Sequence, residues 1–249
     1  MIDWPWPTLA GVAATIVVGY TVYGMSGFGA NIVAMPILAQ LLPLRDAGPM
    51  LAIFDICTGT LLLARWHRHL DWREIARLLP WLLIGIAGGV QALARVDERW
   101  LLLALGAFVL GYSAWSLLRR ANPRPLATAW AMPAGLIGGA VTALYGTGGP
   151  IYTIYLARRL PDKTALRSTI GGVILGNALI RIALYHHAGF YDRPGLVALA
   201  LAMLPCAFIG LWLGGRLHLR AQPRRALNAV WSLLLLAGLG LLWRGFHAA

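Results

Sequence analysis

The stretch Gly146-Thr147-Gly148-Gly149-Pro150 interrupts a long apolar run in the second half of the chain. An earlier stretch, Gly27-Phe28-Gly29-Ala30-Asn31, interrupts an apolar run in the first half. Glycine costs a helix about 1 kcal/mol relative to alanine and proline costs about 3 kcal/mol, so the backbone is expected to leave helical geometry at both stretches. Within a bilayer, non-helical backbone is tolerated only where protein buries it or where it lines a watery cavity. Two such breaks in matching places predict a transport site.

The composition is that of a polytopic, all-α membrane protein. Of the 249 residues, 59% are hydrophobic and 12% are charged, against roughly 25% charged residues in an ordinary soluble domain. The formal net charge is +12, but the arginines stand in short clusters between apolar runs, so no nucleic-acid partner is expected. Cys57 and Cys206 lie within apolar runs and are expected to be small buried thiols rather than a disulfide or a metal pair.

Two of the apolar runs, Ala30–Leu42 and Ile151–Leu160, are shorter than the roughly 20 residues that cross a bilayer. Each is predicted to form the second arm of a bent hairpin whose tip is a glycine cluster.

No basic segment or cleavage pattern accompanies the first apolar run, so we expect no signal peptide and a first span that stays in the protein. The other predicted runs are Thr8–Gly24, Pro49–Ala64, Leu78–Ala94, Trp100–Leu118, Ala129–Tyr145, Ser168–Tyr185, Gly195–Gly214 and Ala226–Trp243.

The two halves of the sequence resemble each other. Leu42–Ala47 matches Leu160–Ala165, and Ile84–Gly89 matches Ile209–Gly215 with a slip of one residue. Several weak matches in one order suggest duplication. We therefore predict a first membrane repeat over residues 1–120 and a second repeat over residues 121–249, with five segments in each.

The positions of the basic residues predict the orientation of these segments. Four loops are rich in arginine and lysine and are expected in the cytoplasm, whereas the loops between them are nearly balanced. Five segments per half then give the second half the opposite orientation, which is an inverted repeat with both termini outside and the two tips entering from opposite sides. The basic loops contain Arg65 to Arg77, Arg119 to Arg124, Arg158 to Arg167 and Arg216 to Arg225.

The predicted tips can bind an anion. Backbone N–H groups at the start of a half-helix carry partial positive charge, and glycine lets a substrate approach them closely. The alternative is that the glycines only allow kinks or tight helix packing. Polar neighbours at both tips favour binding, and the candidate residues are Ser26, Gly27, Gly29, Asn31, Tyr145, Gly146, Thr147, Gly148 and Gly149.

The chain resembles the TauE/SafE family of sulfite exporter-type membrane transporters. Gly27-Phe28-Gly29-Ala30 with Met35-Pro36-Ile37-Leu38 is similar to the first family motif, and Gly146–Tyr152 is similar to the second. Tyr155-Leu156 and Arg167-Ser168-Thr169 match a subgroup pattern, whereas Ala30 and Asn31 depart from the usual run of glycines. The resemblance implies transport of small sulfur-containing or organic anions such as sulfite and sulfonates.

Four further residues are candidates for substrate binding or ion coupling. Arg167 opens a helix beyond the second tip and can reach an anion, or it can be a cytoplasmic anchor. Asn177, further along that helix, can donate to a substrate or to a neighbouring helix. Asp55 and Arg181 lie inside apolar runs, where ionisable groups are costly and often functional. Asp55 can take a coupling proton and Arg181 can neutralise it or the substrate, although a structural ion pair or snorkelling of Arg181 to the interface also fits.

Other classes fit less well. Gly24-Met25-Ser26-Gly27 has the form found in intramembrane serine proteases, but no suitably placed histidine accompanies it, and a scaffold without transport remains the other alternative. The sequence thus favours an inner-membrane secondary transporter without enzymatic activity. It is expected to bind a small anion between its two tips and to move it by alternating access. No ATP-binding loop, cofactor or metal site is expected. Membrane lipid is an expected partner, and association with further copies of the chain remains open.

Overall fold

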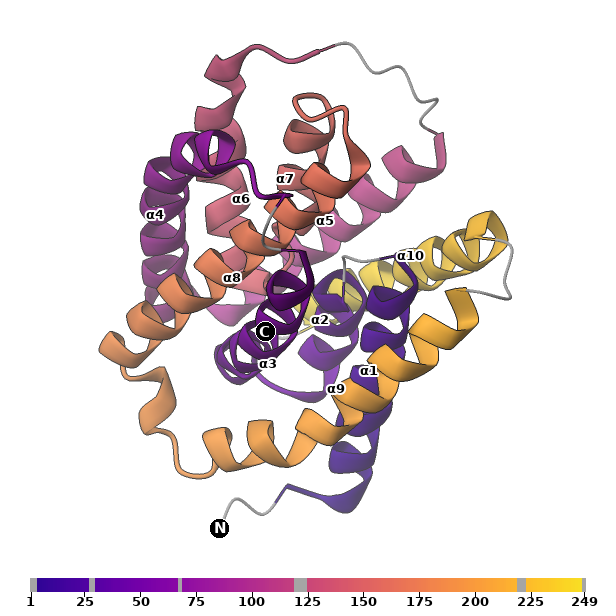
Figure 1. The fold of residues 1–249 in the computed structure, drawn as a ribbon. Helices are drawn as coiled ribbons and strands as arrows, with labels where there is room; N and C mark the ends of the chain where they lie inside the picture. Colours follow the sequence, from indigo (N-terminus) through magenta and orange to yellow (C-terminus); the bar gives the residue numbers. More distant parts are fainter. Residues whose placement is uncertain (1–3, 27–29, 67–68, 119–124, 219–222, 248–249) are drawn as a thin grey trace. The chain divides into compact units, whose positions relative to one another are not determined.

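The computed structural model describes residues 4–26, 30–66, 69–118, 125–218 and 223–247. Within these ranges the chain contains ten α-helices, two short 3-10 helices and no strand (Figure 1). The all-helical prediction is therefore confirmed for the described residues. The helices are α1 (Trp6–Ser26), α2 (Ala30–Leu41), α3 (Leu44–Trp66), α4 (Trp72–Arg95), α5 (Glu98–Leu118), η2 (Thr128–Trp130), α6 (Ala131–Tyr145), α7 (Gly149–Ala157), α8 (Lys163–His187), η3 (Phe190–Asp192), α9 (Leu196–His218) and α10 (Pro223–His247).

Among the described residues, four stretches are long and apolar enough to cross a membrane: Trp6–Met25, Trp72–Arg95, Thr164–His187 and Leu196–Leu217. By contrast, α2 has 12 residues and α7 has nine. At 1.5 Å per residue these two helices are about 18 and 14 Å long, well short of the roughly 30 Å hydrocarbon core. The two short apolar runs of the sequence thus form short helices, and their bending into hairpins remains a prediction.

The chain forms two compact units that interleave the two sequence halves. Unit 1 comprises Met1–Ala47, Arg95–Ala121 and Leu201–Ala249, and it contains α1, α2, α5, α10 and most of α9. Unit 2 comprises Gly48–Ala94 and Asn122–Ala200, and it contains α4, α6, α7, α8 and most of α3. The repeats predicted at 1–120 and 121–249 describe a duplication of the sequence and not compact units of the structure. They remain predictions.

In unit 1, α1 and α9 run in the same direction and approach closely through glycines. A Cβ atom at Gly210 of α9 would lie 2.6 Å from the Val17 carbonyl oxygen of α1, and one at Gly214 would lie 2.8 Å from the Cα atom of Gly24. Such small residues let membrane helices pack backbone to backbone. The short helix α2 also packs on α1, and α5 packs on α10.

Unit 2 repeats this arrangement with α6, α7 and α4. A Cβ atom at Gly139 of α6 would lie 2.6 Å from the Leu82 carbonyl oxygen of α4, and one at Gly89 of α4 would lie 2.7 Å from the Cβ atom of Ala143. These contacts make α4 and α6 parallel, like α1 and α9 (Figure 1). The short helix α7 packs on α6 as α2 packs on α1. Each unit therefore contains the first two helices of one half and the fourth helix of the other.

The remaining pair in unit 2 is antiparallel. Gly48 near the start of α3 lies opposite Tyr185 near the end of α8, and Gly59 of α3 lies opposite Leu175 of α8. This pairing places the middle of α3 against the second half of α8. Asp55 and Arg181 are thereby brought to the same level of the unit.

Candidate functional site

The break between α6 and α7 lies in unit 2 and is set by glycine and proline. α6 ends at Tyr145, and Gly146 follows with a φ of 67°, the left-handed conformation that glycine adopts after a helix. The Gly146 amide donates to the Thr142 carbonyl oxygen over 2.7 Å. α7 begins at Gly149, with Pro150 in its first turn, where the missing proline N–H costs no intrahelical bond. Helical geometry is thus interrupted at the stretch that the sequence singled out.

Gly148 sits against α6 so closely that no side chain fits there. A Cβ atom at this position would overlap the Thr142 hydroxyl and the Gly138 carbonyl oxygen. The Thr142 hydroxyl donates to that carbonyl over 2.6 Å and is also hydrogen bonded to the Tyr152 hydroxyl of α7. These contacts join the two helices on either side of the break.

Two side chains of α8 satisfy the carbonyl groups at the end of α6. The Arg181 Nη1 atom donates to the Thr142 carbonyl oxygen over 3.1 Å, and the Tyr185 hydroxyl donates to the Ala143 carbonyl oxygen. The last carbonyl groups of a helix have no partner within it and carry partial negative charge. A buried guanidinium therefore stabilises the open end of α6.

Arg181 also forms an ion pair with Asp55 of α3, through its Nη2 atom. Arg181 is completely buried and Asp55 is 7% exposed. Burying one such charge alone would be very costly, so each side chain needs the other. The pair has no net charge, and the structural ion pair that the sequence left open is present.

Three buried polar atoms around the break have no hydrogen-bond partner among the described residues. They are Thr147 Oγ1, Asn177 Oδ1 and Arg181 Nε. Thr147 and Asn177 are each 2% exposed. Buried polar groups are almost always paired, so orphaned ones call for an explanation such as a bound ion or ligand. The Thr147 hydroxyl, the Arg181 Nε–H and the N-terminus of α7 form a set of donors that suits a small oxyanion, whereas Asn177 Oδ1 is an acceptor.

The predicted residues of the first half are only partly described. Gly27 and Gly29 lie outside the described residues, and Ser26 is the last residue of α1. Asn31 is the second residue of α2 and is buried in unit 1. Their predicted binding role remains untested.

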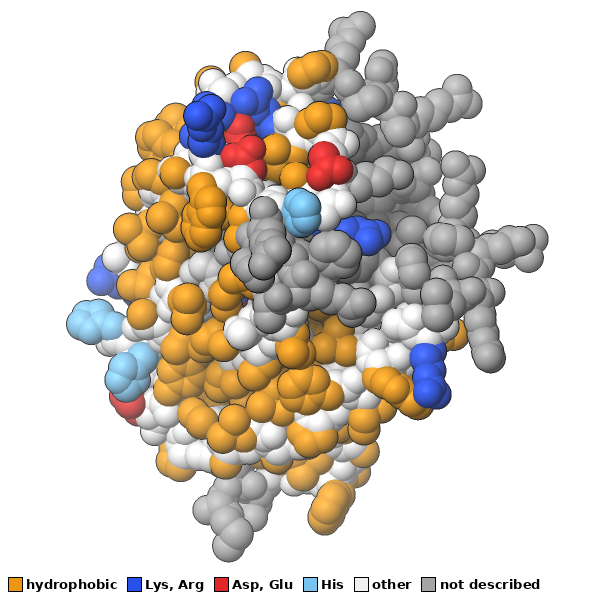
Figure 2. Space-filling model, viewed as in Figure 1, with side chains coloured by type: hydrophobic (Ala, Val, Ile, Leu, Met, Phe, Trp, Pro, Cys, Tyr) orange, Lys and Arg blue, Asp and Glu red, His pale blue; other side chains and the backbone are white. Residues whose placement is uncertain are grey.

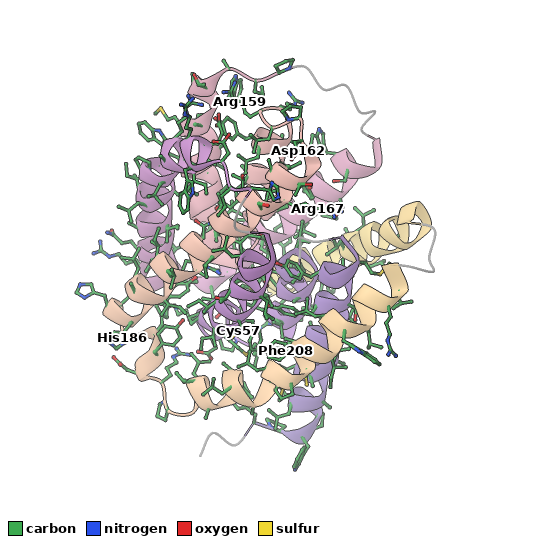
Figure 3. All side chains as sticks on the ribbon, in the orientation of Figure 1. Cys57, Arg159, Asp162, Arg167, His186 and Phe208 are labelled. Carbon is green, nitrogen blue, oxygen red and sulfur yellow. The ribbon has the colours of Figure 1, made fainter. Side chains whose placement is uncertain are left out.

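The second-half candidates fall into two groups. Tyr145, Gly146, Thr147, Gly148 and Gly149 lie at the break, and Asn177, Asp55 and Arg181 lie in the same unit. Arg167 instead is exposed near the start of α8, beside Asp162 (Figure 3). It precedes Arg181 by 14 residues, which is about 21 Å along a helix. The structure therefore does not bring Arg167 to the buried polar cluster.

Sequence reasoning missed three residues that complete this cluster: Thr142, Tyr152 and Tyr185. Tyr152 interacts electrostatically with Arg181 and also interacts with Asn177. A signal for Tyr185 was available, because Asn177, Arg181 and Tyr185 are spaced by four and so share one face of α8. Nothing local marked Thr142 or Tyr152, whose environment depends on the packing of α6 against α7.

A second polar cluster lies at the other end of α7 and was also not anticipated. Glu74, in the first turn of α4, accepts hydrogen bonds from the Tyr155 hydroxyl over 2.7 Å and from Arg159 Nη2 over 2.9 Å. It also forms an ion pair with Arg77. The hydrogen bond to Glu74 raises the pKa of the Arg159 guanidinium, which stays charged. We call Glu74, Arg77, Tyr155 and Arg159 the Glu74 cluster; it fixes the end of α7 to the start of α4.

The described residues contain no group of three or more His, Cys, Asp or Glu side chains that could hold a metal ion. The polar groups described at the break are hydrogen-bond donors and acceptors and one compensated ion pair. Such an arrangement can bind and release an anion.

Comparison with known proteins identifies the family of the chain. The family model described as "Sulfite exporter TauE/SafE" matches residues 11–241, which is nearly the whole chain. The chain belongs to the TauE/SafE family. It is accordingly a membrane transporter of the sulfite-exporter type, and the resemblance predicted from the two glycine motifs is confirmed.

Two relatives extend this result. "Probable inner membrane transporter protein TsaS" of Comamonas testosteroni is 31% identical over 202 residues, which cover 79% of this chain and 84% of that protein. "Probable sulfite/organosulfonate exporter TauE" of Cupriavidus necator is 23% identical over 244 residues, covering 94% of this chain and 93% of that protein. No solved structure matches the chain significantly. The TauE/SafE relatives thus align over most of their length.

Proposed function

We propose that this TauE/SafE protein moves small sulfur-containing or organic anions, of the sulfite and sulfonate type, across the inner membrane. The anion binds at the break between α6 and α7. The single observation that carries this assignment is the set of buried, unpartnered polar atoms of Thr147, Asn177 and Arg181 around an interrupted helix. Burying polar atoms without partners is costly, so a bound ligand at the break accounts for them.

The donors fit the chemistry of this substrate class. Sulfite and sulfonates carry several oxygens on one sulfur, and these oxygens accept charge-assisted hydrogen bonds from guanidinium, hydroxyl and backbone N–H groups. Arg181 already gives two donors to protein atoms and keeps its Nε–H for a substrate. The name of the Cupriavidus relative refers to sulfite and organosulfonate, which agrees with this class.

Transport follows alternating access in a duplicated, inverted framework of five plus five helices. Two features of the units support this. The parallel pairs α1 with α9 and α4 with α6 occupy equivalent places in the two halves, and the glycines of α4 and α9 match in the sequence overlay. The same helix directions arise if the chain changes direction at every connection and each short hairpin arm counts as one pass, which would put the basic loops inside and both termini outside. Arg167 then belongs to the cytoplasmic surface that attracts anions before they bind.

Flux measurements with purified protein in liposomes test the proposed function. We expect saturable uptake of sulfite or a small sulfonate above the flux of protein-free vesicles, with sulfate and thiosulfate as competitors. An imposed pH gradient is expected to increase this flux. Well-folded protein that carries none of these anions under either condition would contradict the proposal and favour a role without transport.

Charge balance links the anion to a proton. The Asp55–Arg181 pair is neutral, so a bound monovalent anion such as a sulfonate leaves one net negative charge in a site of low polarity. Protonation of Asp55 removes that charge and favours binding, and by reciprocity the anion favours proton uptake. Among the described residues, Tyr152, Tyr185 and Tyr191 are ionisable groups that also interact with Arg181. Tyrosine is ordinarily neutral at physiological pH, which leaves Asp55 to take the proton.

Asp55→Asn is expected to remove the pH dependence of flux. In the wild-type protein flux rises as pH falls, because protonated Asp55 accommodates the anion. The asparagine side chain at position 55 is neutral at every pH and keeps a hydrogen-bond acceptor for Arg181. Flux at several pH values, measured with equal amounts of protein, provides the check. Asp192→Asn, on the exposed surface of the same unit, is the control and should retain the wild-type pH profile. An unchanged profile for Asp55→Asn would remove Asp55 from the coupling role.

A further inference from the structure

An apolar groove runs along the outside of unit 2 between α6 and α7. It has a volume of about 200 Å³ and is lined by Trp130 at the end of η2, by Ala134 and Ile137 of α6 and by Ile151 and Ile154 of α7. Trp130 and Ile137 are 55% and 57% exposed. The groove is therefore open to the surroundings of the protein and offers them almost only hydrocarbon.

One end of this groove meets the Glu74 cluster. Two residues of the lining bond directly to it: the Leu126 carbonyl oxygen accepts from Arg159 Nη1 over 3.2 Å, and the Tyr155 hydroxyl donates to Glu74. The cluster holds two guanidinium groups and one carboxylate, so it carries one surplus positive charge. The side chains of Arg77 and Arg159 remain 43% and 26% exposed.

This end of unit 2 has the marks of a membrane–water interface. Trp72 and Trp130 stand at the starts of the parallel helices α4 and α6, and both are more than half exposed. Exposed tryptophans gather at the level of lipid headgroups. Figure 2 shows basic and acidic side chains together at the top of the view, above a surface that is largely apolar. Figure 3 places Arg159 at this end of the unit and His186 at the other.

We infer that the groove binds one anionic phospholipid. The phosphate lies against Arg77 and Arg159, and an acyl chain lies between α6 and α7. From Trp130 to Ile137 the groove follows α6 for about 10 Å, the length of about two helical turns, which accommodates part of an acyl chain. The surplus positive charge of the Glu74 cluster favours an anionic lipid over a neutral one, because basic sites at the cytoplasmic end of membrane helices attract anionic headgroups.

The lipid site contacts the two helices that flank the break, α6 and α7, but it does not include the buried polar atoms of the break. The acyl chain contacts α6 and α7, and the headgroup contacts the cluster that fixes the end of α7. Lipid binding therefore holds the two helices together from outside. This inference does not rest on the identity of the transported anion.

Native mass spectrometry of the full-length protein in mixed micelles tests the lipid site, with phosphatidylglycerol and phosphatidylcholine as probes. We expect one retained phosphatidylglycerol per chain, preferred over phosphatidylcholine. Arg77→Gln removes the surplus charge and leaves Arg159 on Glu74. Since one basic residue near an anionic membrane surface contributes about 1 kcal/mol, the preference should fall about fivefold. Arg95→Gln, an exposed arginine at the opposite end of the same helix, is the control and should keep the preference.

A second pair of variants tests the groove itself. Ala134→Phe fills the groove and should reduce retention of both lipids, whereas Leu83→Phe, on an exposed part of α4, should not. Thermal unfolding of each variant shows whether a loss of lipid retention is accompanied by a loss of protein stability. Equal retention of both lipids by the wild-type protein would overturn the inference. Retention of phosphatidylglycerol by the Ala134→Phe variant at the wild-type level would also overturn it, because the groove would then not hold the acyl chain.

Discussion

Arg181→Gln is expected to destabilise the protein strongly and to abolish transport. The variant leaves the Asp55 carboxylate buried without its guanidinium and takes a donor from the Thr142 carbonyl oxygen. Removing one partner of a buried ion pair typically costs about 3–5 kcal/mol, which is a large part of the stability of most proteins. Thermal unfolding in detergent and anion flux in liposomes are the two measurements.

A double variant separates the structural role of Arg181 from its role in binding. Asp55→Asn combined with Arg181→Gln removes both charges, so it should recover most of the lost stability. Transport should remain about tenfold or more below wild type, because about 1.4 kcal/mol or more of binding is lost with the guanidinium. Arg167→Gln, exposed on the same helix, should change stability by less than about 0.5 kcal/mol. Wild-type flux in the double variant would show that Arg181 does not contact the anion.

Gly148→Ala is expected to reduce transport at least about tenfold while the protein still folds, since about 1.4 kcal/mol of lost binding corresponds to that factor. The added methyl group overlaps the Thr142 hydroxyl and the Gly138 carbonyl oxygen, so the start of α7 must move away from α6. Overpacking of this kind typically costs about 1–3 kcal/mol. The displacement moves Thr147 and the N-terminus of α7 out of the positions that we propose bind the anion. Flux and thermal unfolding of the same preparation distinguish lost binding from lost fold.

Two neighbouring glycines provide matched controls for this substitution. A Cβ atom at Gly149 or at Gly176 would meet open space. Alanine at either position should leave stability unchanged or raise it by up to about 1 kcal/mol through helix propensity. Gly176→Ala should also keep wild-type flux. If Gly148→Ala transported as well as Gly176→Ala, the close approach of the break to α6 would have no role in binding.

The sequence predicted the class of protein and the places where helices break because both are local properties. Long apolar runs form helices in a bilayer, since backbone groups there must be satisfied within the segment. Clusters such as Gly146 to Pro150 interrupt such a run wherever it lies in the fold. The candidates Asp55 and Arg181 were also recognisable alone, because a charge in an apolar run is costly.

The sequence could not predict which residues meet across the fold. Arg181 and Asp55 are 126 residues apart, and Glu74 and Arg159 are 85 residues apart. Helices that are apolar on every side show no periodicity that identifies the face of contact. Arg167 therefore looked as promising as Arg181, although only Arg181 is buried in the cluster.

The sequence by itself thus determined an all-helical membrane transporter of the TauE/SafE family with an interrupted helix in its second half. The tertiary structure decided that Arg181 and Tyr185 close the end of α6, that Thr142 and Tyr152 join the two sides of the break, and that Glu74 fixes α7. The physical reason is the range of the interactions. Solvation and backbone geometry act within one segment, whereas ion pairs and hydrogen bonds between helices depend on the packing of segments far apart in the chain.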